Sequence, residues 1–207
     1  MTALRAPGRP KDLEKREAIL DAALTLFAER GLDGVPIEAI AARSGVSKVT
    51  VYNNFGDKAS IFDCIVQRET DRLSRELGNA TGDGGSLEDR LTCFGRALVT
   101  MLTQPCHLAL DRSVAMEAQR NPTMGKRFFD AGPGRVHGLL TDILAGAAAA
   151  GDIAVDDPAQ AAQDLLSLWL GYQALERRLC GGCVPDEAEL QKRINHSVRL
   201  FLRASRP

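Results

Sequence analysis

The 207-residue sequence lacks the features that mark membrane proteins, secreted proteins and sheet-forming proteins. No stretch approaches the roughly 18 to 20 uninterrupted apolar residues that a bilayer span requires. The basic start of the chain, residues 1–16, is not followed by the apolar block of a secretion signal. No run alternates apolar and polar residues with a period of two, which argues against β-strands. We therefore expect an unprocessed, intracellular protein of the cytoplasm, without membrane contact, whose fold class is all-α.

The sequence is also poor in the constellations that carry chemistry. Its five cysteines are odd in number and mostly lie in helical patterns, so no disulfide framework is expected. Neither a Ser/His/Asp order nor a phosphate-cradling glycine loop stands out, and we predict no enzyme activity, no cofactor and no metal site. The exception is the pair Cys180 and Cys183, because thiols at this spacing bind zinc or cycle as a disulfide. A zinc site needs two more ligands and only His196 is near in sequence, so the pair supports a thiol-responsive regulator as an alternative.

Charge is balanced overall but uneven along the chain. With 26 basic and 27 acidic residues, the net charge of -1 does not by itself indicate a nucleic-acid partner. A cluster of basic residues near the start creates a local positive field. It comprises Arg5, Arg9, Lys11, Lys15 and Arg16. Because residues 1–11 hold Pro7, Gly8 and Pro10 and show no apolar periodicity, they are predicted to form a flexible basic arm.

Apolar residues recur with the spacing of amphipathic helices over most of the remaining chain. The first such pattern begins near Asp12 and stops at Gly31. The other predicted helices span residues 36–43, 47–54, 57–77, 87–103, 108–119, 124–150, 158–179 and 186–203. We expect the pattern over 124–150 to break at the Gly-Pro-Gly of residues 132–134. The sequence thus predicts about nine helices.

The segment 36–55 has the chemistry of a helix-turn-helix. Gly45 permits a sharp turn, Ser47 is placed to cap the next helix, and Val46 can meet Val51 as a hydrophobic staple. Val51 and Phe55 then face the core. The outward side chains of this short helix carry groups that read base edges and hold phosphates. They are Lys48, Val49, Thr50, Tyr52 and Asn53.

Lys58 stands in the first turn of the following helix, where a cation is mildly unfavourable against the helix dipole. Its position is explained if a phosphate binds there, because free backbone donors at a helix start attract anions. Surface decoration is the competing interpretation.

In the order of these features the chain resembles the TetR family over about residues 13–73. The matching residues are Ile19, Ala22, Phe27, Gly31, Ile40, Ala41, Gly45, Val46, Ser47, Thr50, Tyr52, Phe55, Lys58 and Phe62. The resemblance implies that Lys48 and Val49 approach bases, and that phosphates are contacted by Thr50, Tyr52, Asn53 and Lys58. Where the family usually has serine or threonine, this chain has Val35 and Pro36. Proline is well suited to a first helical position, but the hydroxyl contact to a phosphate is missing.

The resemblance also implies two domains after the arm. Residues 12–56 would form a three-helix DNA-binding domain, with the family pattern extending to about 73, and residues 57–207 a larger helical ligand-binding and dimerisation domain. In the arm, Gly8-Arg9-Pro10 resembles the core of an AT-hook, in which an extended backbone carries arginine into a narrow minor groove. Arg9 is therefore a further candidate DNA contact.

The second half of the chain is similar to the AefR-like subgroup around residues 112–134, in the placements of Glu117, Pro122, Phe128 and Gly132. The resemblance implies a homodimer formed by the last two helices. The candidate interface residues are Leu165, Leu168, Trp169, Tyr172, Leu175, Leu190, Ile194, Val198 and Phe201. Candidate effector contacts, for which ordinary core packing is the competing interpretation, are Met101, Cys106, His107, Met116, Phe128, Phe129 and Trp169.

Taken together, the resemblance implies a sequence-specific transcriptional regulator. It would bind a palindromic operator in double-stranded DNA as a homodimer and act as a ligand-responsive repressor, with an unidentified small molecule shifting the dimer between two shapes. A helical protein-interaction module without DNA affinity is the second alternative. The outward Lys48, Thr50, Tyr52 and Lys58 argue against it.

Overall fold

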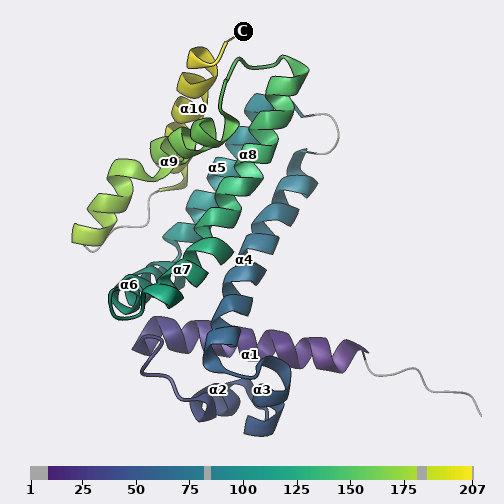
Figure 1. Ribbon diagram of the computed structural model, residues 1–207, viewed down its shortest axis with the longest axis vertical. Coiled ribbons are helices and arrows are strands. Elements are labelled where there is room, and N and C mark those ends of the chain that lie inside the picture. The colour runs from purple at the N-terminus through teal and green to yellow at the C-terminus, as the bar shows by residue number, and fades with distance from the viewer. Residues whose placement is uncertain (1–8, 82–84, 181–185, 207) are drawn as a thin grey trace, which may run out of the picture. The chain divides into compact units, whose positions relative to one another are not determined.

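The structure is a computed structural model that describes residues 9–81, 85–180 and 186–206 (Figure 1). Within these ranges the chain forms ten α-helices and no strand, which confirms the predicted all-α fold class. The helices are α1 (Arg9–Arg30), α2 (Ile37–Ser44), α3 (Lys48–Phe55), α4 (Lys58–Thr81), α5 (Leu87–Thr103), α6 (Pro105–Arg120), α7 (Pro122–Ala131), α8 (Pro133–Ala150), α9 (Pro158–Cys180) and α10 (Glu187–Ala204). None of these helices is long and apolar enough to cross a membrane.

The predicted break over residues 132–134 separates two helices, which is why ten helices form rather than about nine. Helix α7 ends at Ala131 and α8 begins at Pro133. Gly132 between them has a non-helical backbone, with φ -108° and ψ -91°. Proline is well suited to the first position of α8, because its missing N–H would have no partner there in any case.

Helix α1 begins earlier than the sequence predicts. Because Arg9 and Pro10 are already helical, the extended backbone expected for an AT-hook is wrong for these two residues. Proline is tolerated in a first helical turn, so Pro10 does not stop the helix. The side chain of Arg9 and all of residues 1–8 lie outside the described part of the chain, and the minor-groove contact stays a prediction.

The chain divides into two compact units. The first joins Met1–Val66 with Leu108–Phe128, and the second joins Gln67–His107 with Phe129–Pro207. The sequence places a domain boundary near residue 56 and assigns 108–128 to the larger domain. Within the first unit, an aromatic contact and an ion pair bind this segment to α4.

In the first unit α2 packs against α1 and α3 packs against α2 (Figure 1). A row of three aromatic rings runs through the unit. The ring centroids of Phe27 and Phe62 are 6.3 Å apart, and those of Phe62 and Phe128 are 5.7 Å apart. Beside this row Arg127 forms an ion pair with Asp63 of α4. Phe128 is thus a packing residue of the unit that contains the helix-turn-helix.

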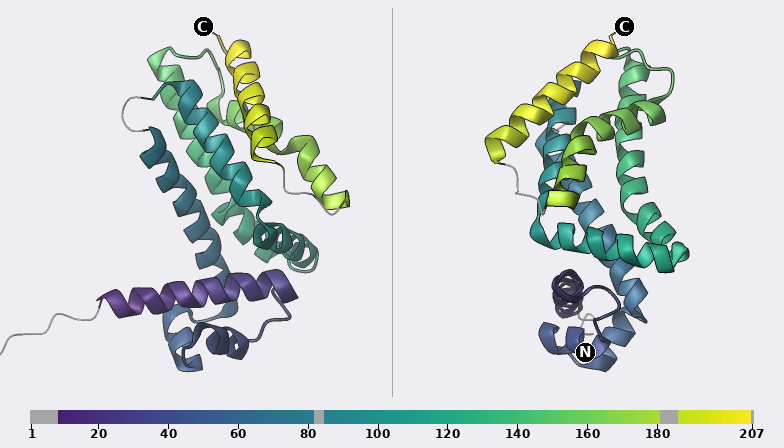
Figure 2. Two further views of the ribbon diagram at one scale, coloured as in Figure 1. Left: turned by 180° about the vertical axis from the view of Figure 1, so that it is seen from behind. Right: turned by 90° about the vertical axis from the view of Figure 1, so that its left-hand side faces the viewer.

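In the second unit α8 packs against α9, and α10 packs against α5 and α9 (Figure 2). Trp169 is fully buried at the centre and stacks on Phe94, with ring centroids 5.8 Å apart. Gly95 lies directly under this ring, because a Cβ atom there would stand 2.7 Å from the indole of Trp169. The close approach explains why a residue without a side chain occupies this position of α5.

The predicted dimer residues divide between core and surface. Six of them are buried within a single chain, with at most 7% of any one residue exposed, so they belong to its core, and their place in an interface stays a prediction. They are Leu165, Trp169, Leu190, Ile194, Val198 and Phe201. The other three, Leu168, Tyr172 and Leu175 of α9, are 40%, 79% and 52% exposed. Leu200 of α10, which was not in the predicted set, is 48% exposed. An amphipathic pattern shows that a face is buried without showing whether the same chain or a second copy covers it.

Candidate nucleic-acid interface

The turn between α2 and α3 has the predicted local chemistry. Gly45 adopts a left-handed conformation with φ 69°, which a residue with a side chain rarely adopts. The Ser47 hydroxyl caps α3 by accepting a hydrogen bond from the backbone N–H of Thr50 at 3.1 Å. On the inner face of α3, Val51 and Phe55 are 1% and 8% exposed. These contacts determine which face of α3 is outward.

The outer face of α3 carries most of the side chains predicted to reach DNA. Val49 is 66% exposed and Tyr52 is 45% exposed, and Lys48 and Asn53 are also exposed. Thr50 is half-buried, and its hydroxyl lies 2.8 Å from that of Ser47. Four of the five predicted residues therefore form one surface that is available to a ligand, and Thr50 stands at its edge.

Lys48 is held in place by two neighbours. Its ammonium group forms an ion pair with Glu38 of α2 and lies 5.7 Å from the centroid of the Tyr52 ring. The hydrogen bond between them lowers the pKa of the Glu38 carboxyl and raises the pKa of Lys48, so both groups are charged at neutral pH. Sequence reasoning missed Glu38, because it lies on the other helix of the motif. An acidic residue in the first turn of the helix that precedes the recognition helix is the sequence signal that could have identified Glu38.

Helix α2 starts without a hydroxyl, as the sequence indicates. Pro36 is the residue before the helix rather than its first residue, and no side chain caps the helix there. Proline also has no backbone N–H. The start of α2 therefore presents fewer hydrogen-bond donors to an anion than a start with serine or threonine.

The start of α4 combines a cation with a capping carboxylate. Lys58 donates from Nζ to the backbone oxygen of Asp33 at 3.3 Å. The Asp57 carboxylate accepts a hydrogen bond from the backbone N–H of Ser60 at 2.7 Å. This bond is the main cause that lowers the pKa of Asp57. Of the backbone donors that were expected to be free for phosphate, Asp57 occupies one.

Arg16 belongs to the basic cluster at the start of the chain, yet its role in the structure is internal. Its guanidinium donates from Nη1 to the backbone oxygen of Asn54 at 3.2 Å and from Nη2 to Sγ of Cys64 at 3.2 Å. The same group lies 4.5 Å from the centroid of the Phe55 ring. Arg16 thus attaches the end of α3 to α1 and α4, and we describe it as a positioning residue for the recognition surface.

Replacing Arg16 with alanine is expected to destabilise the protein and to weaken DNA binding together. Hydrogen bonds to a charged group contribute about 1.5–3 kcal/mol, and in a chain of this size each kcal/mol corresponds to a melting-temperature change of about 2–4 °C. The stability and DNA affinity of Arg16→Lys should lie between those of wild type and Arg16→Ala, because lysine keeps the charge but loses the planar guanidinium group. Thermal unfolding and DNA affinity measured on the same samples check this. Lys15→Ala is the control, since Lys15 is exposed and the same charge is lost; an equal effect of both variants contradicts the positioning role.

The predicted effector residues are divided between the two units. Met116 and Phe128 belong to the first unit and the other five to the second. Met116 and Phe129 are 62% and 58% exposed, whereas Met101 is partly buried against the core of the second unit. Trp169 is buried within that core. Its indole Nε1 has no hydrogen-bond partner among the described residues.

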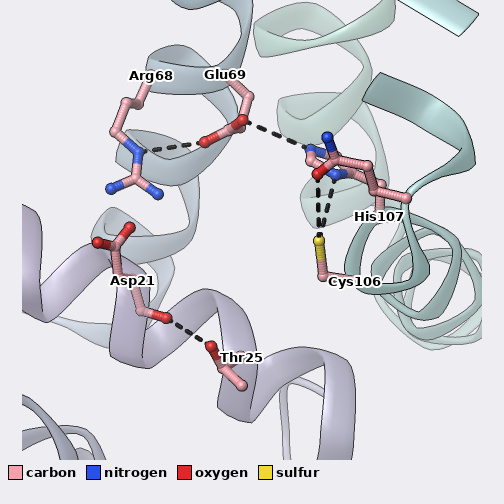
Figure 3. A network of polar contacts seen from close by, with 7 residues as sticks. Asp21, Thr25, Arg68, Glu69, Cys106 and His107 are labelled. Carbon is pink, nitrogen blue, oxygen red and sulfur yellow. Dashed lines mark hydrogen bonds and ion pairs between the residues drawn. The ribbon is translucent and has the colours of Figure 1, made fainter. Parts of the chain in front are cut away.

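Cys106 and His107 do lie together, at the start of α6 (Figure 3). Sγ of Cys106 is 3.5 Å from Nδ1 of His107, and Nε2 of His107 is 3.8 Å from a carboxylate oxygen of Glu69. Burial lowers the pKa of His107, against the opposing effect of Glu69, so the imidazole is neutral at pH 7. Among the described residues no three His, Cys, Asp or Glu side chains are grouped as metal ligands would be. The side chains of Cys180 and Cys183 lie outside the described residues.

Comparison with known proteins agrees with this geometry. Residues 19–65 match the family described as "Bacterial regulatory proteins, tetR family", and residues 89–206 match "AefR-like transcriptional repressor, C-terminal domain". The HTH-type transcriptional regulator YdeS of Bacillus subtilis is 40% identical over 86 residues, which is 41% of either chain. The chain therefore spans about two fifths of the length of this curated relative.

Solved structures extend the similarity over nearly the whole chain. A protein of Mesorhizobium loti MAFF303099, assigned to the TetR family of transcriptional regulators, is 27% identical with a TM-score of 0.81. That alignment covers 97% of this chain and 100% of the other. The flavonoid-responsive regulator FrrA is 30% identical with a TM-score of 0.72, over 93% of this chain and 97% of its own. On its helix-turn-helix, its two matched domains and these relatives, the chain belongs to the TetR family of bacterial regulatory proteins.

Proposed function

We propose that this protein is a sequence-specific DNA-binding transcriptional regulator, not an enzyme, that acts in the cytoplasm. The observation that carries the proposal is the outward face of α3, where Lys48, Val49, Tyr52 and Asn53 are exposed while the opposite face is anchored in the core. Cations, amides, hydroxyls and methyl groups are the side-chain groups that read base edges and bind phosphates in a major groove. Lys58 at the start of α4 adds a phosphate contact.

The direct test is selection of binding sites from a pool of random duplex DNA. We expect the protein to enrich a palindrome, because a dimer with two-fold symmetry reads two half-sites spaced by about one helical turn. If no sequence is enriched at low salt, the protein is a helical protein-interaction module rather than a regulator.

Repression is the proposed direction of regulation, because a dimer bound to an operator blocks polymerase without a further contact surface. The relatives include the repressor KstR and the activator FasR, both of Mycolicibacterium smegmatis, so the relatives alone leave the direction open. A reporter under the selected operator should rise in expression when the gene is deleted. A fall in expression identifies an activator.

We propose that a small molecule releases the protein from its operator. The similarity to the flavonoid-responsive regulator FrrA over nearly the whole chain supports this response. Nε1 of buried Trp169, which has no hydrogen-bond partner among the residues that the structure describes, supports it further, since a buried donor without an acceptor is costly and an effector oxygen would satisfy it. Planar aromatic molecules with hydroxyl or carbonyl groups are the first compounds to screen, with release of labelled operator as the signal.

The homodimer is proposed to form through the exposed apolar side chains of α9 and α10. Helix α9 carries Leu168, Tyr172 and Leu175, and its backbone departs from helical geometry at Gly171. Helix α10 carries Leu200, which lines a hollow of about 230 Å³. An apolar surface of this kind usually marks an interface.

The double variant Leu168→Glu, Tyr172→Glu is expected to raise the dimer dissociation constant by at least about a hundredfold, because a charge buried without a partner costs several kcal/mol. Analytical ultracentrifugation over a concentration series measures it. Gln163→Glu adds a charge at another exposed position of α9 and should leave the dimer intact. A double variant that remains dimeric at the same concentrations rules out this surface.

A further inference from the structure

Glu38 contacts the recognition helix although it belongs to α2. It is the second residue of α2, and its carboxylate pairs with the ammonium group of Lys48, the first residue of α3. The side chains of Glu38 and Lys48 are 60% and 50% exposed. Because an ion pair this exposed adds little to folding stability, its consequence lies in the electric field that approaching DNA encounters.

The pair restricts what Lys48 can do. The ammonium group lies between the Glu38 carboxylate and the Tyr52 ring, which is 5.7 Å away, so its direction is set before DNA arrives. A free lysine on a DNA-binding surface binds any phosphate within reach and adds affinity without sequence preference. Here the negative charge of Glu38 is in contact with the lysine, well within the screening length of about 10 Å, and opposes that attraction.

The start of α2 opposes phosphate binding in a second way. A helix start attracts anions through free N–H groups and hydroxyl side chains. Pro36 supplies neither, since it has no N–H and no capping side chain. Glu38 then places a negative charge in the first turn. Two features of the same helix end thus disfavour the DNA backbone, at the place where Lys48 faces outward.

We propose that Glu38 is a specificity-determining residue, which directs Lys48 away from phosphates and toward a G·C pair in the major groove. The chemistry of the two side chains fits that pair, because lysine donates to guanine O6 and N7 and glutamate accepts from the cytosine amino group. This role rests on the DNA binding proposed above.

The test compares wild type with Glu38→Gln on the selected operator and on random duplex, over a series of salt concentrations. Binding of the variant to random duplex should strengthen severalfold at low salt, with a salt slope steeper by about one unit for each Lys48 that gains a phosphate. The ratio of operator to random affinity should fall about tenfold, as expected when one base contact is lost. A repeated selection with the variant should lose the G·C preference at one position of each half-site.

Glu29→Gln is the matched control. Glu29 pairs with Arg43 at 3.4 Å in the same unit, both side chains are 46% exposed, and the substitution removes the same charge. It should change both affinities by a similar factor and leave their ratio and the selected sequence unchanged. An unchanged ratio in Glu38→Gln, or an equal fall in Glu29→Gln, overturns the role of Glu38. If the wild-type protein shows no sequence preference, the proposed sequence-specific DNA binding is itself wrong. That outcome differs from a failure of the Glu38 proposal alone, in which the wild type still selects an operator.

Discussion

Substituting alanine for both Tyr52 and Lys58 is expected to weaken operator binding by at least about a hundredfold, since each hydrogen bond to a charged group contributes about 1.5–3 kcal/mol. Tyr52 stands on the outer face of α3 and Lys58 at the start of α4, so the double variant removes contacts from two elements of the interface. Because Lys58 carries one charge in each protomer, the salt slope of a dimer should decrease by about two units. Fluorescence anisotropy over a salt series measures both quantities.

The control for this variant is Lys192→Ala, which removes an exposed cation from α10. Its operator affinity should stay close to that of wild type. The single variant Tyr52→Phe removes only the hydroxyl and should account for part of the loss. Operator binding by the double variant that equals wild type at every salt concentration would place the DNA contacts elsewhere on the protein.

Trp169→Ala is expected to lower the free energy of unfolding by about 3–5 kcal/mol, the usual cost of removing a large aromatic side chain from a core. Trp169 is 0% exposed, stacks on Phe94, and lies so close to Gly95 that no side chain fits between them. For a chain of this length the melting temperature should fall by roughly 6–20 °C. Thermal unfolding followed by circular dichroism measures the change.

Tyr172→Ala provides the comparison within the same helix. Tyr172 is 79% exposed, so its loss should change the free energy of unfolding of a single protomer by no more than about 0.5 kcal/mol. Trp169→Phe keeps a stacking ring and removes the indole Nε1, which has no partner in the described part of the chain, and should cost much less than alanine. If Tyr172→Ala destabilises the chain as strongly as Trp169→Ala, the division of α9 into a core face and an exposed face is wrong.

The helix-turn-helix shows how far local sequence carries a prediction. Gly45, Ser47, Val51 and Phe55 act as predicted, because a tight turn, a cap and a buried face depend on residues that are close together in sequence. The break over residues 132–134 was predictable for the same reason, since proline and glycine act on the backbone where they stand. The contacts of Arg16 and Glu38 were not predicted, because their partners lie on other helices and depend on how those helices pack. The cap formed by Asp57 was missed although an aspartate directly before a helix is a local signal.

By itself the sequence determined the all-helical class, the turn and cap of the DNA-binding motif, and the outward face of α3, since short-range rules of backbone and periodicity govern each of these. Only the tertiary structure decided which apolar residues of α9 and α10 belong to the core. Trp169 and Leu168 are neighbouring large side chains that the sequence places in the same interface, yet one is fully buried and the other is 40% exposed. The structure also decided that Lys48 meets Glu38 and that Arg16 meets Asn54. The physical reason is that periodicity shows which side of a helix avoids water, whereas the partner that covers it depends on how distant segments pack.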